Sequence, residues 1–320
     1  IRLFAKGHLF DYYQYKIEVD FAGGTGSLFD GYLNVAYFEE AQLRGGQYKE
    51  PFGLEELTSS RYIKIVERSL ATNFIAPGHD IGMMLHGKLF EGKVEYALGL
   101  FNGNGSNTLD NNDEEDFAAR LVFKPFKDSE NKLLSGFQFG GATTYGKEEL
   151  SVAGGGPRTA ARTNIWTYGA GTISDEERIR WAVETAWHAG PFGLSGEYME
   201  LIEDLGNPTA PAGVDGRVRT HGWYATANYF LTGEDTSFGR VKPKQPFDPF
   251  TDEGGLGAWE IVSRFSHLWT NEDVEAFITG ADRAWEYMGG VNWYPNSHVR
   301  FSLQYQHAEF GDRIAGQGGA

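Results

Sequence analysis

The chain has 320 residues, with 28 Lys and Arg against 44 Asp and Glu, and therefore a formal charge of −16. This acidic balance argues against a nucleic-acid-binding protein, because neutralising phosphate groups requires a surplus of bases. The absence of cysteine excludes disulfides, a thiol nucleophile and a cysteine metal site, and uncharged stretches such as 221–233 are too short for a membrane-spanning helix.

Apolar and polar residues alternate along most of the chain, which is the pattern of β-strands that face two different environments. Each alternating segment has about 9–13 residues, enough to cross a bilayer when the strand is tilted. We count 14 such segments, which in chain order are 1–10, 14–22, 30–38, 41–50, 81–90, 93–102, 116–125, 134–146, 178–189, 192–201, 221–232, 258–269, 284–293 and 298–310.

The connections between these segments alternate in length. The short ones are 11–13, 39–40, 91–92, 190–191 and 294–297, and the long ones are 51–80, 103–115, 147–177, 202–220 and 270–283. Short turns at one end and long loops at the other are typical of outer-membrane barrels. A soluble β-sandwich is the alternative, but its core would not carry charges at nearly every second position of a strand. The sequence therefore predicts an all-β protein, a transmembrane antiparallel β-barrel forming one domain over 1–320.

The longest early connection, 51–80, is the only passage with helical spacing. Thr58, Ser59 and Ser60 are N-cap candidates for a short helix over 61–70. Ile63, Val66 and Leu70 would share an apolar face, and the bases Arg61, Lys64 and Arg68 would share another. We expect this loop to fold into the barrel, with its apolar face on the wall and three cations across the pore. The alternative is a surface helix whose charges are only solvated.

The polar positions of each strand would face the lumen. They carry eight acids and ten bases, and the bases are Arg2, Lys6, Lys16, Lys88, Arg120, Lys124, Arg178, Arg180, Arg264 and Arg300. In the strand 41–50 the sequence does not show which alternate positions face the lumen, so Arg44 and Lys49 are left out of this count. The predicted pore wall is thus slightly basic, while loops and turns carry most of the acidic charge. Selectivity is decided where a pore is narrow, so we expect a modest preference for anions.

Several blocks of sequence resemble one known family. GQYKEPFGLEELTSSRY at 46–62 followed by ERSL at 67–70 is similar to the hallmark of the phosphate-selective porin O/P family. Similar blocks follow in the family's order, namely GPFGL at 190–194, GWY at 222–224, YFLTGE at 229–234, GAWE at 257–260, GVNWY at 290–294 and VRF at 299–301. The family often has an arginine where this chain has His79, and a neutral imidazole contributes a weaker field.

The resemblance implies a 16-stranded barrel in the outer membrane of a Gram-negative bacterium, a homotrimer, and an inward-folded loop that narrows the pore. It also implies passive diffusion of small anions such as phosphate or polyphosphate, and contact with outer-membrane lipid and lipopolysaccharide. The opening and closing strands are expected to be absent from the chain as given. The predicted constriction comprises Arg61, Lys64, Glu67, Arg68 and His79, and the predicted pore wall includes Lys16, Lys88, Arg120, Arg178, Arg180, Arg264 and Arg300.

Enzyme readings find little support in the sequence. The patterns G-x-S-x-G, H-E-x-x-H and the phosphate-binding P-loop do not occur, and we expect no cofactor and no metal site. Three alternatives stay open: a general diffusion pore without selectivity, a barrel that encloses a redox partner, and a barrel with a hydrolase site on its rim. A loop 51–80 inside the barrel would obstruct an enclosed partner, so its position discriminates a pore from a barrel that encloses a redox partner.

Overall fold

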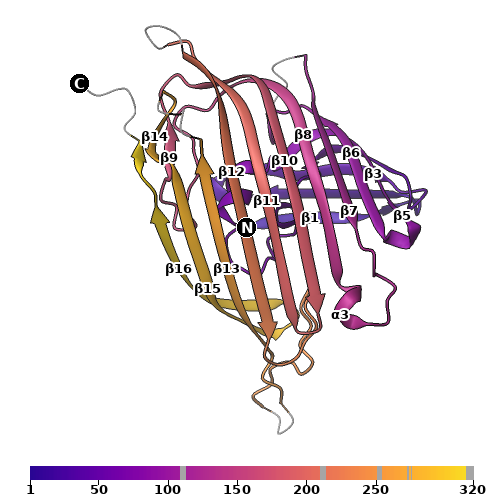
Figure 1. The fold of residues 1–320 in the computed structure, drawn as a ribbon. Coiled ribbons are helices and arrows are strands. Elements are labelled where there is room, and N and C mark those ends of the chain that lie inside the picture. Colours follow the sequence, from indigo (N-terminus) through magenta and orange to yellow (C-terminus); the bar gives the residue numbers. More distant parts are fainter. Residues whose placement is uncertain (109–112, 210–213, 251–253, 272–273, 275, 315–320) are drawn as a thin grey trace.

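The computed structural model describes residues 1–108, 113–209, 214–250, 254–271, 274 and 276–314. Figure 1 shows a curved antiparallel sheet whose strands follow one another in chain order. Its 14 strands are β1 (Arg2–Leu9), β2 (Tyr13–Asp20), β3 (Ser27–Val35), β4 (Gln42–Lys49), β5 (His79–Leu89), β6 (Val94–Phe101), β7 (Asp116–Phe123), β8 (Phe137–Ser151), β10 (Ile173–Ala189), β11 (Phe192–Asn207), β12 (Val214–Phe230), β13 (Ala258–Thr270), β15 (Arg283–Asn296) and β16 (Val299–Phe310).

Each of the 14 predicted segments corresponds to one of these strands, so the predicted all-β class is confirmed. In the part of the chain that the structure describes, the sheet is not closed, and β1 and β16 form its two edges. A second, small sheet joins β9 (Trp166–Tyr168), β14 (Ile278–Ala281) and β17 (Arg313–Ile314).

Apolar and charged side chains lie on the two faces of the sheet in the way that contact with lipid requires. Along β13, Trp259, Ile261 and Phe265 are exposed on the convex side, while Glu260 and Arg264 are buried on the concave side. Apolar side chains thus point outward and charged ones inward, the reverse of a soluble protein.

Strand lengths differ from the prediction on one side of the sheet. β8, β10, β11 and β12 have 15 to 17 residues and extend into the connections 147–177 and 202–220 that the sequence assigned to loops. Backbone pairing continues beyond the expected strand ends, for example between Ser174 of β10 and Leu150 of β8.

Connection lengths separate the two ends of the sheet. The turn side carries the short connections 10–12 and 190–191, and the loop side carries the long segment 50–78. Two turn-side connections are longer than expected: 124–136, which contains α3 (Lys132–Ser135), and 231–257. The rule of short turns at one end therefore holds only in part. Two 3-10 turns, η1 (Ala22–Gly24) and η2 (Phe90–Gly92), complete the elements.

The segment 50–78 lies on the concave side of the sheet and contains α1 (Leu54–Leu57) and α2 (Leu70–Ile75). In Figure 1 it is seen behind β11 and β12, and α2 packs against β11, β12 and β13. Leu70, Ala71 and Ile75 join a buried apolar cluster with residues of these strands and of the small sheet. No helix among the described residues is long and apolar enough to cross a membrane.

Candidate functional site

The predicted helix over 61–70 is wrong, because residues 58–69 form turns and bends between α1 and α2. The N-cap that the structure uses is Ser69, whose hydroxyl accepts a hydrogen bond from the amide of Thr72 at 3.1 Å. Without the helix, the expected stripe of Arg61, Lys64 and Arg68 does not form. The helical spacing of 61–70 does not produce a helix, because residues of this stretch form hydrogen bonds and ion pairs with distant strands instead.

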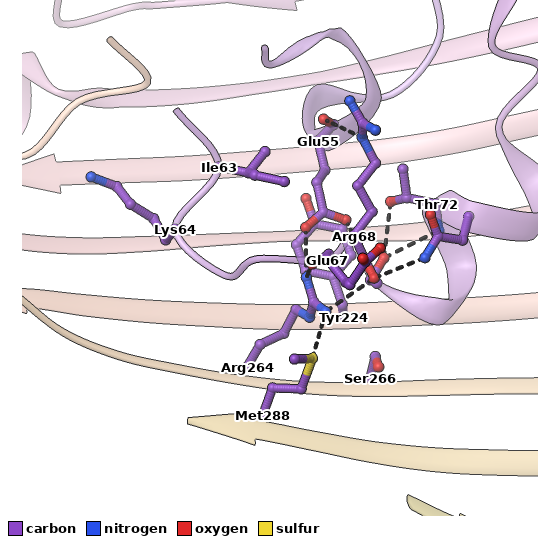
Figure 2. Close-up of polar contacts among 12 residues, drawn as sticks. Glu55, Ile63, Lys64, Glu67, Arg68, Thr72, Tyr224, Arg264, Ser266 and Met288 are labelled. Atoms are coloured by element: carbon purple, nitrogen blue, oxygen red, sulfur yellow. Dashed lines mark hydrogen bonds and ion pairs between the residues drawn. The ribbon is translucent and has the colours of Figure 1, made fainter. Parts of the chain in front are cut away.

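Arg264 on β13 connects the inner segment to the wall (Figure 2). Its side chain is 1% exposed and donates to Glu55 Oε1 at 2.9 Å. It also donates to the backbone carbonyls of Glu67 at 2.7 Å and Arg68 at 3.0 Å. A guanidinium presents five donors in a fixed fork, which suits several acceptors at once. Arg264 therefore holds α1 and the start of α2 together.

Glu197 on β11 provides a second attachment. Its two carboxylate oxygens accept from the backbone amides of Leu54 at 2.6 Å and Glu55 at 2.8 Å. The hydroxyl of Tyr224 donates to the same carboxylate at 2.6 Å. These amides begin α1 and have no partner within the helix, so the carboxylate satisfies donors that would otherwise be left without acceptors. The strands thus bind the inner segment through one cation, Arg264, and one anion, Glu197.

Lys64 and Arg300 complete the attachment near β15 and β16. Lys64 has a side chain that is only 7% exposed and lies 2.9 Å from Glu260, and in Figure 2 it points away from Arg68. Arg300 donates to the carbonyl of Ile63 at 2.6 Å. Both predicted pore cations are therefore engaged by contacts between the inner segment and the wall.

The opposite face of the segment borders an open space against β1–β5. This loop-side cavity has a volume of about 660 Å³. Three acids line it, Glu18, Asp30 and Glu56, together with His79. Its bases number six, namely Arg2, Lys16, Arg44, Lys49, Arg61 and Arg68. The cavity is therefore basic although the chain as a whole is acidic.

Most of these cations have a carboxylate close by. Lys16 lies 2.5 Å from Asp30, Lys49 lies 2.7 Å from Glu56, and Arg68 lies 3.1 Å from Glu56. Pairing reduces the field that such a cation projects into the cavity.

Arg44 and Arg61 differ from the other cavity bases. In the part of the chain that the structure describes, neither forms an ion pair with a carboxylate. Arg44 lies over the rings of Tyr32 and Tyr48, 4.5 and 5.4 Å from their centroids. Arg61 lies 5.1 Å from the ring of Phe4. Aromatic rings position a guanidinium without neutralising it, so these two charges remain available to an ion.

A second space, the turn-side cavity, lies beyond Arg44 and Lys49 and has a volume of about 410 Å³. Arg44, Lys49 and Leu57 line both cavities. Lys88 and Arg120 line the turn-side cavity, and Arg120 pairs with Glu184 at 2.5 Å. Arg44 therefore stands between two water-accessible spaces.

The remaining predicted site residues lie away from these cavities. Arg178 is buried and pairs with Asp116 at 3.1 Å and Glu148 at 3.2 Å. Arg180 is buried close to Thr144, and the Glu67 side chain lies 3.6 Å from the exposed Arg162.

His79 is the one predicted constriction residue that comes from a strand bordering the loop-side cavity. Its ring lies 3.6 Å from Asp30 and 4.0 Å from the ring of Phe29. It therefore shares Asp30 with Lys16.

Sequence reasoning missed Arg44 and Lys49, which it left unassigned. The signal was present: Gln42, Arg44 and Tyr48 occupy alternate positions of β4, with the exposed Leu43 between them. Gly46, with φ at +128°, interrupts the pattern where its backbone meets Gly31. This irregularity made the strand's polarity hard to read.

Comparisons with known proteins concern the chain and its fold as a whole. The family model for phosphate-selective porin O and P matches residues 1–313. The chain is 28% identical to Porin O of Pseudomonas aeruginosa over 339 residues, covering 96% of this chain and 75% of that protein.

Two solved structures share the fold at low sequence identity. The outer membrane channel DcaP of Acinetobacter baumannii has a TM-score of 0.59 at 12% identity, over 99% of this chain and 80% of that one. An anion-selective porin from Comamonas acidovorans has a TM-score of 0.58 at 10% identity, over 97% and 78%.

Proposed function

The chain belongs to the phosphate-selective porin O and P family, and from this we propose that it passes small hydrophilic solutes across the outer membrane with a modest preference for anions such as phosphate or polyphosphate. The observation that carries the preference is the loop-side cavity, where six bases face three acids. Charges in a narrow, poorly screened space govern which ion enters. The net charge of −16 belongs mostly to positions outside this cavity.

We assign different roles to the predicted site residues. Arg61 and Arg68, with Arg44, form the cationic lining that an anion meets, and His79 and Lys16 belong to the same wall. Lys64, Arg264 and Arg300 attach the inner segment to the strands. We propose that residues 1–320 form a single domain, built on the 14-stranded sheet with its inner segment 50–78.

The reversal potential in a salt gradient tests the proposed preference. With purified protein in a planar bilayer and a tenfold KCl gradient, we expect a potential whose sign reports chloride moving more easily than potassium. Phosphate added to the same bilayer should compete with the chloride current. Arg44→Gln should reduce the magnitude of the potential, because it removes an unpaired charge between two cavities.

Arg217→Gln is the matched control for Arg44→Gln. Arg217 also carries one positive charge, but it lies on β12 outside the cavities and pairs with Asp204 and Glu177. It should leave the potential unchanged. A wild-type potential of zero, or one of cation sign, would contradict the proposed anion preference.

A comparison of Lys64→Met with Arg61→Met separates attachment from selectivity. Lys64→Met should lower the free energy of unfolding by about 3 kcal/mol, because breaking a buried ion pair leaves a charge without its partner. Arg61→Met should leave stability within about 1 kcal/mol, since Arg61 is exposed, but should reduce the reversal potential. Thermal unfolding in detergent and bilayer recordings measure the two effects. Equal losses of selectivity in both variants would argue against this division of roles.

The porin family points to a channel rather than an enzyme. The position of the inner segment supports this reading over a barrel that encloses a redox partner, because α2 and its neighbours occupy the concave side of β11–β13. The proposal includes a homotrimer in contact with outer-membrane lipid and lipopolysaccharide. Light scattering of the detergent-solubilised protein, with the detergent mass subtracted, checks the assembly.

A further inference from the structure

Two turn-side connections are longer than simple turns, and parts of both fold against the convex side of the sheet. They are 124–136, which contains α3, and 231–257, of which residues 245–257 are concerned. Figure 1 shows the two connections at the same end of the sheet. The convex side of the strands carries the exposed apolar side chains that face lipid. Both connections therefore adjoin the border of the lipid-facing surface.

Indole groups of the strands attach each connection to the convex side. Trp187 of β10 donates from Nε1 to the carbonyl of Leu133 at 2.5 Å. Trp259 of β13 and Trp293 of β15 donate in the same way to the carbonyl of Leu256, at 3.1 and 2.9 Å. At a membrane surface the polar end of an indole faces water or lipid headgroups. Here the backbones of the two connections occupy that position beside the rings.

Aromatic contacts continue from the strands into both connections. The ring of Phe126 lies 6.5 Å from that of Phe137 at the start of β8. The ring of Phe247 lies 5.2 Å from that of Trp293, and the amide of Phe247 donates to the carbonyl of Pro295 at 2.8 Å. Side chains of the strands and of the connections thus form one continuous surface at each of the two places.

Both connections present leucines to the surroundings. Leu133 is 58% exposed, Leu134 43% and Leu256 70%. Exposed apolar surface of this kind marks a site of contact with another apolar phase. Each connection also carries an exposed lysine, Lys132 or Lys242, that forms no ion pair within the described part of the chain. Leucines bordered by lysines fit the layer where acyl chains meet lipid phosphates.

We propose that Phe126, Leu133, Leu134, Phe247 and Leu256, named here the turn-side patch, lie in the headgroup layer of the turn-side phospholipid leaflet. The patch is continuous with the lipid-facing side of the strands. It is also divided between two places, one at β8 and β10 and one at β13 and β15. A leaflet surrounds the sheet at one depth and contacts both places at once. This inference deepens the proposed contact with outer-membrane lipid and rests on it.

Depth-dependent fluorescence quenching tests the turn-side patch. The chain has no cysteine, so Leu133→Cys and Leu256→Cys each provide a single labelling point for a fluorophore. The labelled full-length protein is reconstituted into phosphatidylcholine vesicles that contain phospholipid with a nitroxide either at the headgroup or in the middle of the acyl chain. We expect both labels to be quenched more strongly by the headgroup nitroxide than by the mid-chain nitroxide or by iodide in the water.

Two further labelling points calibrate the measurement. Val183 is 52% exposed on the convex side of β10, and a label on Val183→Cys should be quenched most strongly by the mid-chain nitroxide. Ala153 is exposed in the loop-side connection after β8, and a label on Ala153→Cys should respond to iodide alone. These two positions mark the lipid interior and the water.

A second substitution tests whether the leucines hold the connection in lipid. Leu134→Gln in the Leu133→Cys background should shift the label from lipid toward water by about tenfold, the effect of exposing one leucine. Leu100→Gln in the same background is the matched control. Leu100 is 55% exposed at the loop end of β6, so its loss should leave the quenching of this label unchanged.

Quenching of the patch labels by iodide alone, while the label on Val183→Cys reports lipid, would overturn the proposal and leave the patch to a partner in solution. Excimer emission from pyrene on Leu133→Cys or Leu256→Cys would place a second copy of the chain there and would also overturn it. An absence of lipid quenching at all positions would reject the lipid contact of the sheet as well. The measurement is independent of the reversal potential: a non-selective pore with lipid-quenched patch labels would reject the proposed anion preference and keep this inference.

Discussion

Arg264→Met should release the inner segment from the wall, with loss of stability and an increase in single-channel conductance. The substitution removes donors to Glu55 and to two backbone carbonyls. It also leaves Glu55 and Glu286 as buried acids that have lost a cation, 2.9 Å and 3.9 Å away in the native protein. Removing one partner of a buried ion pair typically costs about 3–5 kcal/mol.

The conductance change follows from the position of the segment. Arg264 holds the stretch that carries Arg68 at the edge of the loop-side cavity. Once this attachment is lost, the stretch can move and the passage widens, so current should rise and fluctuate more. Thermal unfolding in detergent and bilayer recordings measure the two effects on the same preparation.

Two further variants make the result interpretable. Arg217→Met removes an arginine with two acid partners, but its side chain is 47% exposed, and exposed pairs contribute about 0–1 kcal/mol. Arg264→Lys keeps the charge with fewer donors in a different geometry and should give an intermediate stability. An Arg264→Met variant with native stability and conductance would show that Glu197 and Lys64 hold the segment without it.

Reversing the charges of Arg44 and Arg61 together should change the pore from anion-selective to cation-selective. The loop-side cavity would then contain four Lys or Arg residues and five acids instead of six and three. Two unit charges 8 Å apart interact by about 2 kcal/mol at an effective dielectric constant of about 20. Since 1.4 kcal/mol is a factor of ten, the permeability ratio should shift about tenfold or more.

The control for Arg44→Glu with Arg61→Glu is Arg217→Glu with Arg219→Glu. Both double variants make the same change in net charge, but Arg217 and Arg219 are exposed on β12 outside the loop-side and turn-side cavities. Only the cavity variant should reverse the sign of the potential in a KCl gradient, and the difference should diminish at high salt. Retained anion selectivity in the cavity variant would place the selective charges elsewhere.

The strands could be predicted because alternation is a local property. The period of two in 258–269, for instance, shows both that a strand exists and which side chains lie inward. The extended ends of β10 and β12 were missed because polar residues there resemble loop sequence, although their backbone pairs with β11. The helix over 61–70 was wrong because its spacing was correct for a helix in isolation, while Ile63 and Lys64 bond through their carbonyls to Arg300 and Asn292.

By itself, the sequence determined the sheet, its inward charges and the presence of a segment inside it. The period-two alternation and the blocks that resemble the family can be read directly from the chain. The acidic net charge argued against nucleic-acid binding. Only the tertiary structure decided which cations face an ion. Lys64 and Arg264 pair with Glu260 and Glu55, nearly 200 or more positions away, and no local pattern reveals such partners. Arg44, left unassigned by the sequence, lies over the rings of Tyr32 and Tyr48 and pairs with no carboxylate of the described residues.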